Sequence, residues 1–192
     1  MKNALASASA MIGRNSHGLI LDDVLQSCLS QQQRDGLDKI QRLDLSKVKL
    51  KLGKPEIGSK GEVWTPEQVS VAEFWYKRFL ILILLRPGHK RVPNGVVDAF
   101  WHQHILDTRS YFKDIMDIFG RFLHHDPYFG IRAELGGNDD RKEHARCFRQ
   151  TCRDLHDLFG EDYSATESLF PGMSGLGWDC CELDDECSDE EM

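Results

Sequence analysis

Residues 65–88 restrict the possible folds of this chain more than any other segment, because the start, the end and the burial of this segment can all be inferred. Thr65 is a favourable N-cap, Pro66 suits the first helical position, and Gln68 completes a capping box. The seven apolar residues from Phe79 to Leu85 leave the second half of the helix without a polar face, and the following Arg-Pro-Gly ends it. Such a helix must be enclosed by other elements, so we expect it at the centre of the core.

The remaining periodicity is also helical. It indicates a first helix from Leu19 that stops at Gly36, a short helix followed by an extended piece at 48–52, one continuous helix over 95–119, and a last helix over 140–159 closed by Gly160. We therefore expect an all-α fold, a compact single-domain helical bundle of four or five helices. At 192 residues the chain is long enough for one such domain. The predicted boundaries are a flexible lead-in at 1–18, a single helical domain at 19–178 and a tail at 179–192.

The formal net charge of −7 is concentrated in this tail, which contains eight carboxylates and no basic residue. Without the tail, residues 1–178 carry a formal charge of +1. Nucleic-acid binding requires a basic surface, so no nucleic-acid partner is expected. The composition predicts a disordered acidic C-terminal tail that keeps the protein in solution or binds a protein partner. The sequence does not define the role of Cys180, Cys181 and Cys187 in this tail, nor the oligomeric state.

The sequence also predicts the compartment. The longest apolar run is far shorter than the roughly 20 residues that cross a bilayer, and the N-terminus lacks the apolar stretch of a secretory signal. We therefore expect a cytoplasmic protein with no membrane association and with reduced cysteines. No paired C-x-x-C spacing is present, which argues against a zinc finger.

Four of the eight histidines lie between residues 102 and 125, and this concentration is the strongest functional signal. On the predicted helix, Asp98 and His102 are four residues apart, so the carboxylate can orient the imidazole. His104 lies near the middle of the apolar arc, where a buried imidazole needs partners for its ring nitrogens. Asp107 lies within about one turn of His104.

His124 and His125 precede an Asp-Pro pair that favours a turn, so either histidine could fold back onto the helix. If one of them meets His104 and an aspartate, the site offers three nitrogen or oxygen ligands and an open position. That donor set suits a divalent transition metal, with Zn or Fe favoured. The predicted metal ligands are Asp98, His102, His104, Asp107, His124 and His125.

Two functions stay open at this point. One is a metal-dependent enzyme of undefined substrate, which would use metal-activated water or oxygen chemistry. The other is a non-catalytic protein-interaction or regulatory module in which the histidines are structural.

The segment from Val92 to Gly130 resembles the glycine-rich-domain-containing-protein-like family. The resemblance depends on a D-x-x-W-H-x-H-x-L-D core beginning at Asp98, on Tyr111, and on the L-H-H-x-P-Y-F-G that ends at Gly130. With the preceding helix it covers about residues 66–130. It implies a helical domain in which the W-H-x-H element recurs, without an established activity. The chain lacks the long glycine-rich extension of the larger members, so functions attached to those proteins are not carried over.

Overall fold

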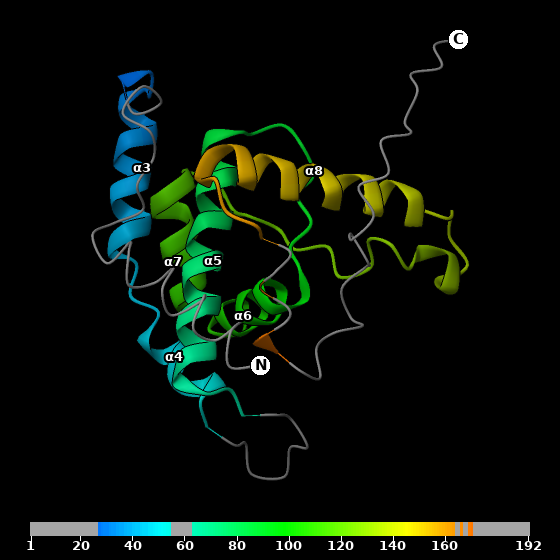
Figure 1. Ribbon diagram of the computed structural model, residues 1–192, viewed down its shortest axis with the longest axis horizontal. Helices are drawn as coiled ribbons and strands as arrows, with labels where there is room; N and C mark the ends of the chain where they lie inside the picture. The colour runs from blue at the N-terminus through cyan, green and yellow to red at the C-terminus, as the bar shows by residue number, and fades with distance from the viewer. Residues whose placement is uncertain (1–26, 55–62, 164–165, 167–168, 171–192) are drawn as a thin grey trace.

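The computed structural model describes residues 27–54, 63–163, 166 and 169–170. These residues form six α-helices and one short 3₁₀ helix, without a strand, which confirms the all-α prediction (Figure 1). The helices are α3 (Gln31–Arg42), α4 (Ser46–Leu52), α5 (Pro66–Leu85), α6 (Gly95–Leu106), α7 (Thr108–Phe119) and α8 (Arg141–Phe159), with η1 (Arg132–Leu135) before α8. The predicted lead-in, the start of the first helix at Leu19 and the acidic tail lie outside the described residues.

Helix α5 occupies the centre of the core, as its apolar second half predicts. It contacts α3, α4, α6 and α8, and Figure 1 shows it surrounded by them. The expected capping box is present, with the Gln68 amide nitrogen 3.2 Å from Thr65 Oγ1 and the Thr65 amide nitrogen 2.8 Å from Gln68 Oε1. Phe79, Leu80, Ile81 and Leu82 are fully buried. Burying each such side chain stabilises the fold by about 1.5 to 3 kcal/mol, so this helix anchors the four helices that contact it.

The predicted continuous helix over 95–119 is wrong, because the chain breaks at Asp107. Asp107 leaves helical geometry at φ −82° and ψ 67° and becomes the N-cap of α7. Its carboxylate accepts hydrogen bonds from the Ser110 hydroxyl at 2.8 Å and the Ser110 amide at 3.4 Å. Capping by a short acidic side chain outweighs helical continuation here. Helices α6 and α7 consequently run in different directions (Figure 1), so side chains beyond residue 107 do not lie where one helical wheel puts them.

Two predictions near the N-terminus are also corrected. Gly36 does not end a helix; it lies inside α3, where a Cβ atom would be 2.8 Å from Leu84 Cδ2 of α5. The missing side chain therefore lets α3 and α5 approach closely. Residues 48–52 are helical rather than extended: Val48 and Leu52, four residues apart, face inward, whereas Leu50 is 57% exposed.

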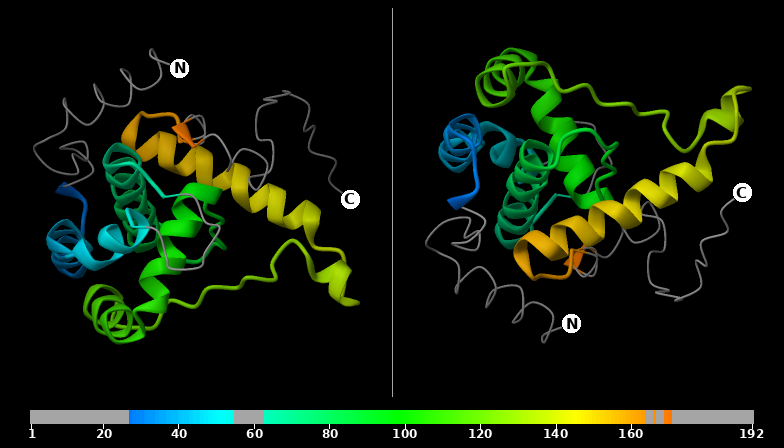
Figure 2. Two further views of the ribbon diagram at one scale, coloured as in Figure 1. Left: turned by 90° about the horizontal axis from the view of Figure 1, so that it is seen from below. Right: turned by 90° about the horizontal axis from the view of Figure 1, so that it is seen from above.

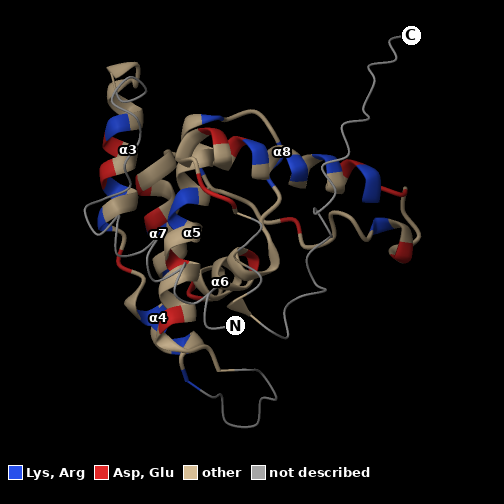
Figure 3. Cartoon of the chain, in the orientation of Figure 1, with Lys and Arg blue, Asp and Glu red and all other residues tan. Residues whose placement is uncertain are grey.

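After α7 the chain passes along α6 and then extends away from the helices to η1, before α8 leads back. Gly120 ends α7 in the left-handed conformation at φ 66°, and Figure 2 shows the following segment running outward to η1 before α8 leads back. Gly160 closes α8 at φ 66°, as predicted. Acidic and basic residues are mixed along α8 (Figure 3). None of the described helices has the combined length and apolar character that crossing a membrane requires.

Candidate metal centre

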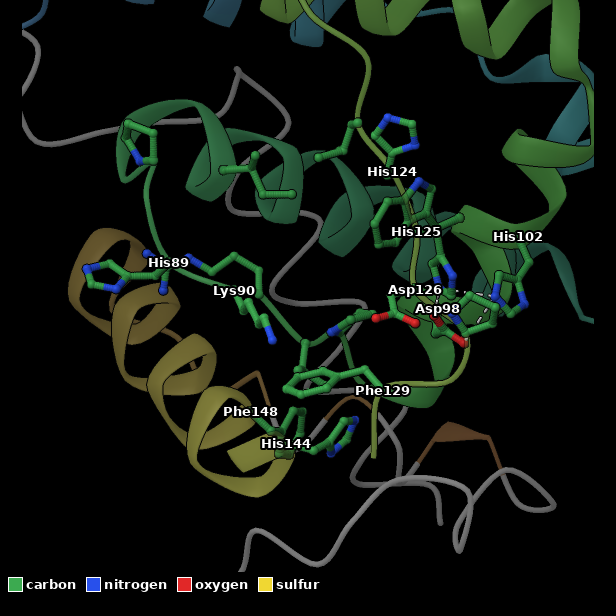
Figure 4. Close-up of a pocket in the computed structure, with 18 of the residues that line it drawn as sticks. His89, Lys90, Asp98, His102, His124, His125, Asp126, Phe129, His144 and Phe148 are labelled. Atoms are coloured by element: carbon green, nitrogen blue, oxygen red, sulfur yellow. Dashed lines mark hydrogen bonds and ion pairs between the residues drawn. The ribbon is translucent and has the colours of Figure 1, made fainter. Parts of the chain in front are cut away.

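The structure brings three of the predicted ligands together. Asp98 and His102 project from the same face of α6, and His125 meets them from the segment after α7 (Figure 4). His125 Nε2 lies 2.9 Å from Asp98 Oδ1 and 3.2 Å from His102 Nε2, and His102 Nε2 lies 3.6 Å from Asp98 Oδ2. We refer to Asp98, His102 and His125 as the DHH group.

Hydrogen bonds alone satisfy the DHH group poorly. If His125 Nε2 carries a hydrogen, that one hydrogen has to serve both the Asp98 carboxylate and the His102 nitrogen. If it carries none, the imidazole and the carboxylate place lone pairs against each other. A cation at the centre would accept a lone pair from all three side chains at once.

The spacing also agrees with metal coordination. Zinc–nitrogen bonds of 2.0–2.1 Å in a tetrahedron place neighbouring ligand atoms about 3.3 Å apart. The three contacts of 2.9, 3.2 and 3.6 Å bracket that separation. Two imidazoles and one carboxylate on one side of a metal would leave its remaining positions open.

A buried hydrogen-bond chain holds His125 in place. The Trp101 indole nitrogen donates to the Tyr111 hydroxyl at 3.0 Å, and that hydroxyl donates to the Leu123 carbonyl at 2.7 Å. The Trp101 ring also packs against the His125 ring with centroids 4.7 Å apart. Residues of α6 and α7 thus fix the path of the chain two residues before His125.

The DHH group forms part of the wall of a cavity of about 580 Å³. The other walls come from the α5–α6 connection, from residues 121–129 and from the first half of α8 (Figure 4). Gly130 allows α8 to approach this wall: it adopts φ +98°, and a Cβ atom there would lie 2.9 Å from the His144 ring. Burial lowers the pKa of His144, against the opposing charges of Asp140 and Asp98, so His144 tends to be neutral.

His104 does not join the DHH group. Its Nδ1 lies 2.9 Å from the Tyr76 hydroxyl and its Nε2 lies 3.2 Å from Asp114 Oδ2, and the residue is 1% exposed. A carboxylate only accepts, so Nε2 carries the hydrogen and the Tyr76 hydroxyl donates to Nδ1. Burial lowers the pKa of His104, while the Asp114 hydrogen bond and the charges of Asp114 and Asp107 oppose that shift. Both ring nitrogens are therefore occupied within the core.

The other two predicted ligands also lie apart from the DHH group. Asp107 caps α7, and the Ser110 hydroxyl is the main cause of its lowered pKa. His124 is exposed and packs on Phe122 with ring centroids 4.8 Å apart. Its ring lies away from the dashed contacts that join the DHH group in Figure 4.

Several residues around the site were not predicted from the sequence. Trp101 and Tyr111 belong to the motif that carries the family resemblance, but no role at the site was predicted for them, and their hydrogen bond depends on the change of direction at Asp107. The cluster of Arg86, Lys90 and Arg91 that lines the cavity follows a helix end and has the composition of an ordinary loop. His144 reaches the cavity from α8, which no local spacing indicates.

A family model described as UCP032817-like matches residues 57–167, which include the whole DHH group. Neither a curated protein nor a solved structure matches the chain. The resemblance to the glycine-rich-domain-containing-protein-like family stays a prediction.

Proposed function

The chain belongs to the UCP032817-like family, and we propose that it binds a divalent transition metal through Asp98, His102 and His125. The observation that carries the proposal is the convergence of one carboxylate and two imidazoles, all with ligand atoms within 4.8 Å of one another. The two imidazoles come from positions 23 residues apart, so their meeting is a product of the tertiary fold.

The donor set favours zinc or non-haem iron. Two imidazoles are borderline ligands and, with one carboxylate, they suit both metals, whereas calcium and magnesium prefer oxygen ligands alone. Asp98 would neutralise part of the metal charge and the imidazoles would bind as neutral ligands. The open side of the DHH group faces the cavity, so a bound substrate could reach it.

We further propose that this site is catalytic and that the protein is a metal-dependent enzyme. A metal in such a site polarises a bound oxygen and lowers the pKa of a bound water. The chain itself would contribute a partly apolar cavity and the neutral imidazole of His144, which can accept a proton at the cavity wall.

Elemental analysis of untagged protein tests the metal proposal. We expect about one equivalent of zinc or iron, lost in His102→Ala and His125→Ala and kept in His124→Ala. His124→Ala is the matched control, because it removes an adjacent, exposed imidazole that lies outside the DHH group. Protein that is metal-free, with a melting curve that does not respond to added Zn²⁺ or Fe²⁺, would refute the proposal and favour an interaction module with structural histidines.

A cytoplasmic location and a protein partner for the acidic tail are also proposed. The eight carboxylates at 179–192 support the second, because an isolated acidic segment favours a basic partner surface. Truncation after Gly177 should leave the metal content unchanged while removing any such partner in a pull-down with the full-length chain as control. Cell fractionation tests the location.

A further inference from the structure

The cavity beside the DHH group has a basic wall whose charge the metal proposal does not use. Four Lys or Arg residues line the cavity: Arg86, Lys90, Arg91 and Arg121. The carboxylates that line it are Asp98 and Asp126. Asp98 belongs to the DHH group and Asp126 forms an ion pair with Arg132, so both are engaged already. The cavity therefore presents an excess of positive charge.

The α5–α6 connection carries the densest part of this wall. Asp154 of α8 accepts from both Arg86 and Arg91, so one carboxylate is shared between two guanidinium groups. A second carboxylate, Asp157, lies 3.4 Å from Arg86 but is 60% exposed, where solvent screens it. A third carboxylate, Glu143, lies 3.5 Å from Lys90, and these two side chains are 49% and 59% exposed. Of the three carboxylates, only Asp154 is buried, so solvent screens the other two and leaves them weak partners for the basic groups.

Arg91 has a donor left over. Its side chain is 4% exposed, its Nη1 pairs with Asp154 and its Nη2 donates to the Arg86 carbonyl at 3.1 Å. Its Nε is buried and has no hydrogen-bond partner among the described residues. Because this Nε is fully buried, it does not face the cavity, and Arg91 contributes to the wall a positive charge that Asp154 and the Arg86 carbonyl hold in place.

Apolar side chains form another part of the cavity wall. Ile83, Trp101, Phe129 and Phe148 line it, and Lys90 Nζ lies 4.5 Å above the centre of the Phe129 ring. A volume of about 580 Å³ is in the range of sites for small molecules. The ligand that fits both parts has one anionic group and an apolar or planar body.

We propose that this cavity binds a small organic anion, a carboxylate or phosphate ester, whose charged group lies against Arg86, Lys90 and Arg91. Guanidinium groups match both acids through paired N–H donors. That this anion is the substrate of the metal centre rests on the proposed function. The binding itself does not, because the basic wall and the DHH group are made of different residues.

Calorimetric titration with three probes of similar size tests the proposal: benzoate, phenyl phosphate and the neutral benzyl alcohol. Each is titrated into metal-free and zinc-loaded full-length protein. We expect at least one of the two anions to bind metal-free protein at least tenfold more tightly than benzyl alcohol, and the stronger anion identifies the acid class. Binding of all three probes with equal affinity, or of none, overturns the proposal.

Charge variants locate the site. Arg86→Gln and Lys90→Gln should each weaken binding of the preferred anion about tenfold, and Lys142→Gln, an exposed charge on α8 outside the cavity, should not. Arg86 is 35% exposed and Lys90 is 59% exposed, so these substitutions leave the core intact. Anion binding that requires zinc and ignores both variants overturns the proposal, because the anion is then only a metal ligand. If the His102→Ala variant loses the metal and still binds the anion, the anion site and the metal site are separate. The metal proposal can then fail while the anion proposal holds.

Discussion

Replacing Tyr111 by Phe is the sharpest test of how the fold positions His125. The Tyr111 hydroxyl is the only link in the described structure between the Trp101 indole and the Leu123 carbonyl. Removing it keeps the ring, which is 2% exposed, and deletes two hydrogen bonds. The change therefore acts on the chain segment that carries His125 without opening a large cavity.

The expected size follows from what each partner loses. Trp101 is 5% exposed, so its N–H has no water to replace the hydroxyl and the loss costs about 1 to 3 kcal/mol. The Leu123 carbonyl is part-buried and regains some hydration, which adds about 1 kcal/mol. We expect the free energy of unfolding to fall by about 2 to 4 kcal/mol. The loosened 123–125 segment should weaken metal binding about 10- to 100-fold, as loss of an outer hydrogen bond commonly does at metal sites.

Urea unfolding of metal-free protein measures the first effect, and competition with a chelator at a temperature where the variant is folded measures the second. Tyr128→Phe is the control, because Tyr128 lies three residues after His125 but is 56% exposed. Its substitution should change neither quantity. If Tyr111→Phe loses stability and keeps its metal affinity, the hydrogen-bond chain supports the core alone and the argument about His125 fails.

Three further outcomes can be measured on metal-free protein. Gly36→Leu should lower the free energy of unfolding by about 1 to 3 kcal/mol, and with it the melting temperature, because the new side chain meets Leu84 of α5. Asp35→Leu, at an exposed position of the same helix, should not. Equal melting curves for the two variants would contradict the α3–α5 contact. Burial lowers the pKa of His104 below 6.5, so below this pH the unfolded state binds a proton that the folded state does not. The free energy of unfolding should therefore fall as the pH drops below about 6.5, by up to about 1.4 kcal/mol per pH unit. His104→Gln should flatten this slope, and an unchanged slope would rule out His104 as its source. Glu161→Ala should lower the free energy of unfolding in urea by about 3 to 5 kcal/mol, because it leaves the Arg78 guanidinium, 2% exposed, without its carboxylate. Burial already lowers the pKa of Arg78. A loss under 1 kcal/mol would show that the aromatic rings around Arg78 stabilise its charge without Glu161.

Local signals predicted much of this fold. The Thr65–Gln68 capping box and the apolar run at 79–85 determine where α5 begins and why it is central, and neither depends on distant residues. Gly160 closes α8 for a similar reason, because a left-handed residue is a local requirement. At Asp107 the error occurred because two local preferences compete, helix continuation and side-chain capping. At Gly36 it occurred because a tertiary contact, the close approach to Leu84 of α5, explains the glycine.

In the candidate site too, some features follow from local sequence and others from the tertiary structure. The sequence by itself placed Asp98 and His102 on one helical face, because four residues make about one turn, and it marked His124 and His125 alike as residues able to fold back. Only the tertiary structure decided that His125 rather than His104 meets them. The turn at Asp107 directs α7 so that Asp114 contacts one nitrogen of His104, while Tyr76 of α5 contacts the other. Tyr111 of α7 then fixes the segment that carries His125. The basic cavity wall is likewise a tertiary product, since α8 supplies the shared carboxylate that holds Arg86 and Arg91 in place.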